Sequence, residues 1–129
     1  MKKTNKKYNI GIIGSGFIAR GFIMALKNHP LLRAASVLTR RDVSNLGEFP
    51  ISANLITNDV NILIKNSDLV VECSGDVIHG TAMLEKVMDA GLPVVTMNSE
   101  LQIVTGTLLA RKGTLVEAEG DQPGSLAAL

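Results

Sequence analysis

The fold of this protein is decided near its N-terminus, where the chain reads Asn9-Ile10-Gly11-Ile12-Ile13-Gly14-Ser15-Gly16-Phe17-Ile18-Ala19. An apolar run ends in a glycine turn, and a helical pattern follows at once. Gly14, Gly16 and Ala19 fit the spacing G-x-G-x-x-G/A. In that motif the first glycine permits a tight turn, the second admits a pyrophosphate to the backbone, and the small third residue lets the helix approach the strand.

The helix that follows this turn would present free N–H groups and a positive dipole end to phosphates. We therefore predict a dinucleotide-binding turn. The alternative is a turn that merely needs glycines, although the position at the start of a strand and helix alternation favours binding. The predicted contacts of this turn are Gly14, Ser15, Gly16, Phe17 and Ile18.

The rest of the chain alternates short apolar runs with helical patterns. Most of the runs are continuous, as expected for parallel strands that are buried on both faces. Right-handed crossovers then give a doubly wound sheet. We predict an α/β, Rossmann-type parallel sheet of about six strands in a three-layer αβα arrangement. The predicted strands are Tyr8–Ile13, Arg33–Leu38, Asn54–Thr57, Leu69–Cys73, Val94–Met97 and Leu115–Ala118.

Helical patterns lie between these strands. The first carries an apolar stripe through Ile18, Phe22 and Leu26, and Pro30 is expected to stop it after residues 28 and 29. The loop Arg41–Ser52 replaces a helix after the second strand. The remaining helical segments are a short one from Val60 to Asn66 capped by Asn58 or Asp59, one through Met83, Leu84, Val87 and Met88 that closes at Gly91, and one from Ser99 to Gly113.

Composition limits the possible classes. The chain has 129 residues, 46% of them hydrophobic and 19% charged, which predicts one globular domain with a real core. Four of the 13 basic residues are lysines within residues 1–7, so the remainder has nine basic against 12 acidic residues. That balance, with no Trp, argues against nucleic-acid binding. We expect a basic tip at residues 1–7 and an NAD(P)-binding domain at 8–129.

Cysteine usage and apolar runs bear on the compartment. The single cysteine excludes a disulfide framework and a Cys-rich zinc site. The basic tip and Tyr8–Ile13 imitate a secretory signal, but the glycine turn and Arg20 interrupt it. No apolar run approaches the length of a membrane span. The expectation is a cytoplasmic protein without a membrane or a bound metal.

The end of the second predicted strand bears on the choice of cofactor. NAD-preferring sites usually have Asp or Glu there to hold the ribose 2′-hydroxyl. Here the chain reads Thr39-Arg40-Arg41, and the first acid is Asp42. Because guanidinium groups pair well with phosphate, we predict NADP(H) over NAD(H), with Thr39, Arg40 and Arg41 on the 2′-phosphate. The alternative is a solvated basic loop.

Other residues are expected at the same edge of the sheet, because ligands lie beyond the carboxyl ends of the strands. Ser74 and Gly75 are predicted to line the ribose or nicotinamide side, together with Asn98 after the fifth strand. Asp76 either caps the next helix or contacts a ligand. A structural role is favoured for the remaining candidates: Cys73 as a buried thiol rather than a nucleophile, and His29 as a helix-end residue. His79, near the start of a helix that faces the same edge, is favoured as a helix-surface residue, with contact to nicotinamide or substrate as the alternative. Glu117, Glu119 and Asp121 are favoured as a polar strand end, with a Mg²⁺ or proton-transfer site as the alternative.

With these residues in view, the chain resembles the N-terminal cofactor domain of the homoserine-dehydrogenase-like oxidoreductases. The subgroup it most resembles carries a C-terminal SAF domain and includes members similar in activity to 1-deoxy-D-xylulose 5-phosphate reductoisomerase. The resemblance rests on Ile10–Ala19, Val94–Glu100 and Glu117–Gly124. It implies NAD(P)-dependent oxidation or reduction of a small oxygenated metabolite. Homoserine dehydrogenases tend to have Asn-Lys where Asn98-Ser99 stands here, which argues against homoserine itself.

The function predicted from the sequence is therefore the cofactor-binding part of an NADP(H)-dependent oxidoreductase. No catalytic acid or base can be assigned, and the substrate domain is expected to lie outside this chain. The alternative is a stand-alone dinucleotide-binding or sensor module without catalysis, since this fold hosts both. A homo-oligomer that completes the site is a further possibility.

Overall fold

The computed structural model describes residues 7–74, 77–97 and 115–117, which form a six-stranded, fully parallel sheet. The strand order is β3-β2-β1-β4-β5-β6. Connections run outward from β1 on one side and from β4 on the other, so a crevice opens where the order reverses. The predicted Rossmann-type fold is confirmed. The strands are β1 (Tyr8–Ile13), β2 (Leu32–Leu38), β3 (Ile56–Thr57), β4 (Leu69–Glu72), β5 (Val94–Thr96) and β6 (Leu115–Glu117).

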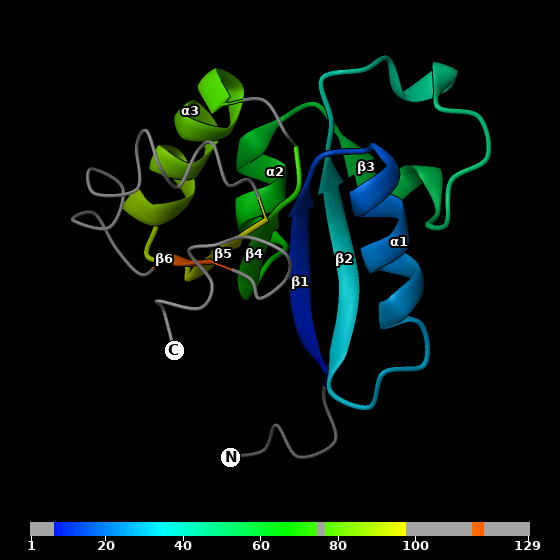
Figure 1. Ribbon diagram of the computed structural model, residues 1–129, viewed down its shortest axis with the longest axis horizontal. Coiled ribbons are helices and arrows are strands. Elements are labelled where there is room, and N and C mark those ends of the chain that lie inside the picture. Colours follow the sequence, from blue (N-terminus) through cyan, green and yellow to red (C-terminus); the bar gives the residue numbers. More distant parts are fainter. Residues whose placement is uncertain (1–6, 75–76, 98–114, 118–129) are drawn as a thin grey trace.

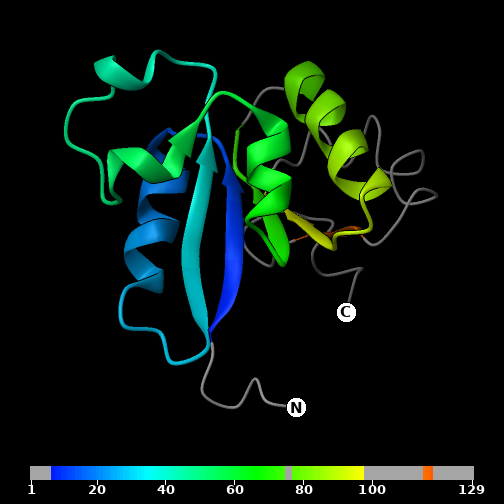
Figure 2. The ribbon, with the colours of Figure 1, turned by 180° about the vertical axis from the view of Figure 1, so that it is seen from behind.

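Helices cover both faces of this sheet, which gives the predicted three layers (Figures 1 and 2). The helix α1 (Phe17–Leu26) packs on one face, and α2 (Val60–Lys65) and α3 (Val77–Asp89) pack on the other. The loop after β2 contains only short 3-10 turns, at Val43–Asn45 and Ala53–Leu55. It therefore replaces a full helix, as the sequence predicted.

The side chains of β1 divide between two apolar clusters. Ile10 and Ile12 pack with Ile23 of α1, whereas Ile13 packs with Leu63 of α2 and other residues on the opposite face. These side chains are almost completely buried, and each contributes about 1.5–3 kcal/mol on transfer from water. Burial on both faces explains why the strand reads as a continuous apolar run.

Two boundaries differ from the sequence prediction by two residues or more, and several others by one. The helix α1 ends at Leu26 rather than near Pro30, because the cap residue Lys27 is already extended and Asn28 follows with a φ of 65°. The nitrogen Nδ1 of His29 then accepts the N–H groups of Leu31 and Leu32, at 3.0 and 3.1 Å. His29 is thus structural, as expected. The strand β3 is shorter than predicted because residues 53–55 form a 3-10 turn.

Some sequence predictions fall outside the described residues. These are the basic tip at residues 1–6, the helix from Ser99 to Gly113, Asp76, and Glu119 with Asp121. Across the described ranges, no helix is long and apolar enough to cross a membrane. Nor do three or more His, Cys, Asp or Glu side chains gather there in a way that could hold a metal ion.

A close approach at Gly11 provides a test of the packing. A Cβ atom there would lie 2.1 Å from Ser67 Oγ and 2.9 Å from Leu63 Cδ1, so the change Gly11→Ala overpacks the β1 and α2 contact. We expect a loss of about 1–3 kcal/mol in the free energy of unfolding, measured by urea denaturation. The matched control is Gly21→Ala on α1, where no described atom lies within 4 Å of the added carbon.

The control change should raise stability by about 0.5–1 kcal/mol, because alanine favours an exposed helix more than glycine does. A Gly11→Ala variant as stable as the Gly21→Ala variant would contradict the described packing of β1 on α2.

Candidate functional site

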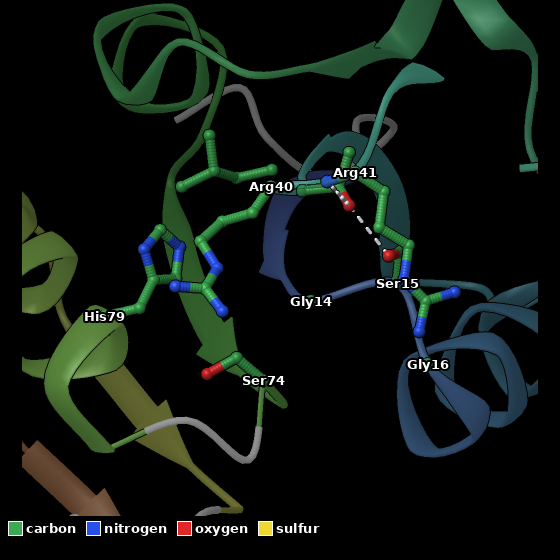
Figure 3. Close-up of a pocket in the computed structure, with 9 residues that line it drawn as sticks. Gly14, Ser15, Gly16, Arg40, Arg41, Ser74 and His79 are labelled. Atoms are coloured by element: carbon green, nitrogen blue, oxygen red, sulfur yellow. Dashed lines mark hydrogen bonds between the residues drawn. The ribbon is translucent and has the colours of Figure 1, made fainter. Parts of the chain in front are cut away.

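A cavity of about 530 Å³ opens at the carboxyl ends of β1, β2 and β4, where the strand order reverses (Figure 3). Three segments far apart in sequence build it: the glycine turn after β1, the start of the loop after β2, and the end of β4 with the start of α3. A ligand site at this place is expected for an open parallel sheet. The lining residues are Gly14, Ser15, Gly16, Leu38, Thr39, Arg40, Arg41, Ser74 and His79.

The structure brings together most of the residues predicted as contacts. Phe17 and Ile18 lie on the first turn of α1, with exposed side chains, next to the lining residues of this cavity. Gly75 and Asn98 lie outside the described residues. His79, expected as a helix-surface residue, instead lines the cavity. This place agrees with the alternative interpretation, in which His79 faces the ligand edge of the sheet.

Gly14 makes the turn at the end of β1. Its φ of 121° lies in the region that side-chain-bearing residues rarely adopt, and its amide donates to the carbonyl of Leu38 at 2.8 Å. A Cβ atom on it would lie 3.0 Å from the carbonyl carbon and oxygen of Cys73. Glycine is therefore needed here both for the turn and for the approach of β4.

Gly16 is the N-cap of α1 and leaves that helix end open. No side chain caps the first turn, which contains no acidic residue. A Cβ atom built on Gly16 would meet no described atom within 4 Å. The first N–H groups of α1 and the bare backbone at Gly16 thus fit a phosphate group, which needs donors and close access.

A buried hydrogen bond joins the glycine turn to the end of β2. The hydroxyls of Ser15 and Thr39 lie 2.7 Å apart, and the two residues are only 6% and 4% exposed. The Thr39 hydroxyl also accepts the amide of Arg41 at 3.1 Å. Thr39 was predicted to contact a 2′-phosphate, and the structure shows that its hydroxyl already has these two protein partners.

The two arginines after Thr39 are exposed and line the cavity. In the view of Figure 3, the Arg40 side chain extends toward the His79 side of the cavity and that of Arg41 toward Gly16. The nearest acid, Asp42, is turned to Ser44, whose amide and hydroxyl donate to Oδ1 at 3.0 and 2.8 Å. These hydrogen bonds lower the pKa of Asp42, and the one from the hydroxyl has the larger effect.

Arg20 holds the loop after β2 against the glycine turn, a role that the sequence did not suggest. Its guanidinium donates to the carbonyls of Ser15, Glu48 and Leu46 at 3.3, 2.8 and 3.3 Å. It also lies 4.8 Å from the centre of the Phe49 ring. From the sequence, an arginine on the first turns of a helix is expected to be a solvent-exposed charge, and no local pattern indicates these contacts.

The end of β4 carries a buried carboxylate that the sequence analysis missed. Glu72 is completely buried, and its Oε2 accepts both the amide (at 2.8 Å) and the hydroxyl of Ser74. Its Oε1 accepts the hydroxyl of Thr96 on β5 at 3.0 Å. A buried carboxylate needs such partners, and these contacts fix the position of Ser74 at the edge of the cavity. An acid within a continuous apolar run was the available signal.

Cys73 is buried, as expected, with its sulfur 3.7 Å from that of Met97. Burial, and then the negative charge of Glu72, raise the pKa of its thiol to about 12. The thiolate is the nucleophile in cysteine chemistry. Cys73 therefore does not act as a nucleophile at neutral pH.

We predict that iodoacetamide at pH 8 labels Cys73 at least about a hundredfold more slowly in the folded protein than in urea, because the native thiol is both shielded and protonated. Mass spectrometry would follow the labelling, and rapid labelling of the native chain would contradict the buried placement.

The raised pKa also makes the free energy of unfolding depend on pH. The stabilising contribution of the neutral thiol is present below its ordinary pKa of 9.0 and is lost as the pH rises toward about 12.

Solved structures of similar fold include several dehydrogenases and an NAD-binding protein from Listeria innocua. A homoserine dehydrogenase from Thiobacillus denitrificans is 18% identical, with a TM-score of 0.72, over 87% of this chain and 29% of its own. One from S. aureus is 23% identical, with a TM-score of 0.73, over 88% of this chain and 32% of its own. A UDP-N-acetylglucosamine 3-dehydrogenase from Acidithiobacillus ferrooxidans is 18% identical, with a TM-score of 0.62, over 86% and 38%.

These likenesses establish the fold, and the chain spans about a third of the length of the two homoserine dehydrogenases. No curated protein sequence matches the chain significantly. The sequence model of the family described as homoserine dehydrogenase, NAD binding domain, matches residues 14–114. That range contains the glycine turn, both arginines and the end of β4, and it covers most of the 129 residues. The chain therefore belongs to the homoserine dehydrogenase NAD-binding domain family, whose cofactor is a nicotinamide dinucleotide.

Proposed function

We propose that this chain is the cofactor-binding part of an NADP(H)-dependent oxidoreductase that acts on a small oxygenated metabolite. Residues 8–129 would form the cofactor domain, and the proposal extends to a carbonyl or alcohol substrate as in the dehydrogenases of similar fold. The observation that carries it is the pair Arg40 and Arg41, which lines one cavity with the glycine turn. When bound, the dinucleotide would donate the hydride to a carbonyl or accept it from an alcohol.

The chain's own contribution is to hold the cofactor in place. The glycine turn and the open end of α1 would receive the pyrophosphate, with Gly14, Ser15, Gly16, Phe17 and Ile18 around it. Thr39 would hold the turn that carries the arginines, and Arg40 and Arg41 would pair with the 2′-phosphate. Ser74, fixed by Glu72, would line the ribose or nicotinamide side. Gly75 and Asn98 remain proposed contacts on the same side.

The choice of NADP(H) over NAD(H) rests on charge at the end of β2. An NAD-preferring site places a carboxylate there, which accepts the ribose hydroxyls and repels a 2′-phosphate. Here Oδ1 of Asp42 accepts two hydrogen bonds from Ser44, and no described residue pairs with the Arg41 guanidinium. Two cations beside an exposed cavity support recognition of a phosphate group.

A binding titration tests the cofactor preference. Wild-type protein should bind NADPH at least about tenfold more tightly than NADH, and Arg40→Asp should remove most of that difference, because a charge-assisted bond is replaced by repulsion. Nucleotide fluorescence or calorimetry measures both affinities. Lys7→Asp makes the same change of charge before β1, at the opposite edge of the sheet, and should preserve the preference. Equal affinities of wild type for the two nucleotides would refute the assignment.

A second variant tests the place of the pyrophosphate. Gly16→Ala adds a carbon that meets no described protein atom, so the free energy of unfolding should change by less than about 1 kcal/mol. The same carbon would stand where a phosphate approaches the backbone. NADPH affinity should therefore fall at least about tenfold. Gly21→Ala, farther along α1, should leave affinity unchanged. Unaltered binding by Gly16→Ala would place the dinucleotide elsewhere.

A further inference from the structure

Asn58 makes a contact that neither the sequence nor the proposed cofactor assigns to it. It directly follows β3 and was one of two candidates to cap α2. Asp59 performs that role, since its Oδ1 accepts the amide of Asn61 at 2.8 Å. The Asn58 side chain instead reaches back to the loop after β2. Its Nδ2 donates to the carbonyls of Thr39 and Arg41, at 2.6 and 3.0 Å.

This contact spans the short segment that carries the arginines. The two carbonyl oxygens can only accept, so the amide nitrogen faces them and both of its hydrogens are used. The amide of Thr39 also donates to the carbonyl of the neighbouring Thr57 at 3.0 Å, and within the segment the Thr39 hydroxyl accepts the amide of Arg41. The backbone on both sides of Arg40 is thus tied, while the arginine side chains stay exposed.

We propose that Asn58 is a positioning residue that sets the preference for a 2′-phosphorylated nucleotide. It does so by holding the 39–41 backbone in the shape that directs Arg40 and Arg41 into the cavity. This inference rests on the proposed NADP(H) function. Both donors of the Asn58 amide are occupied by the protein, so it has no donor left for a phosphate and acts on the 2′-phosphate through the arginines.

The physical basis is preorganisation. A guanidinium binds phosphate through donors in a fixed plane, so its affinity depends on the direction in which the backbone presents it. Without Asn58, two carbonyls lose their donor and the segment gains freedom that binding must then remove. The resulting loss of affinity concerns the 2′-phosphate, because the glycine turn is held by other hydrogen bonds, those of Gly14 and Arg20.

Two nucleotide fragments isolate this effect, because 2′,5′-ADP differs from 5′-AMP only by the 2′-phosphate. Calorimetric titration of the full chain should show that wild type prefers 2′,5′-ADP. In Asn58→Ala, affinity for 2′,5′-ADP should fall roughly threefold to tenfold, while affinity for 5′-AMP changes less than about twofold. Asn61→Ala removes the same group from an exposed position on α2 and should leave both affinities unchanged.

Thermal unfolding of each variant accompanies the titrations, and Asn58→Ser is a second variant whose shorter side chain also cannot bridge both carbonyls. A lower ratio of the 2′,5′-ADP affinity to the 5′-AMP affinity, in either folded variant, supports the proposal. Equal losses for both fragments would assign Asn58 to the adenosine itself and overturn it, as would an unchanged ratio. A wild type without preference for 2′,5′-ADP would overturn the NADP(H) proposal and this inference together, whereas a preference that survives both variants overturns this inference alone.

Discussion

At Gly14 the chain leaves β1 with a left-handed φ, and the backbone of Cys73 at the end of β4 lies 3.0 Å from where a Cβ atom would be. This close approach is the constraint on which the rest of the site depends. It brings the end of β4 beside the glycine turn at the point where the strand order reverses. A side chain at residue 14 would push these backbones apart, and the cavity between them would lose its shape.

From that point the site is assembled by ties between segments that are distant in sequence. The hydroxyls of Ser15 and Thr39 join the glycine turn to the end of β2, and Arg20 joins the same turn to the loop beyond. Asn58 then joins that loop to the region after β3. Because each tie uses donors and acceptors of the protein itself, the backbone around the cavity is set before a ligand binds. The arginine side chains are exposed beside this preset backbone.

The features that could be predicted from the sequence are those that short stretches encode. Continuous apolar runs separated by helical stripes indicated the parallel sheet, and the glycine spacing indicated the turn. The left-handed Gly91 and the cap of α2 also follow local chemistry, although the sequence could not choose between Asn58 and Asp59. Both types of side chain cap helices well. Only the position of the Thr39 and Arg41 carbonyls, which the fold supplies, decides which one does.

The features that could not be predicted depend on contacts across the sheet. Glu72 sits in an apolar run because Thr96 and Ser74 donate to it from β5 and from the turn after β4. The Thr96 partner is in place only once β4 and β5 have paired. The distribution of charged groups around the cavity also depends on how the strands are paired. Glu72 is buried behind Ser74 on the β4 side, whereas Arg40 and Arg41 start from the end of β2 and extend to opposite sides of the cavity. The cavity therefore presents exposed positive charge to a ligand while its carboxylate stays buried, which favours an anionic ligand.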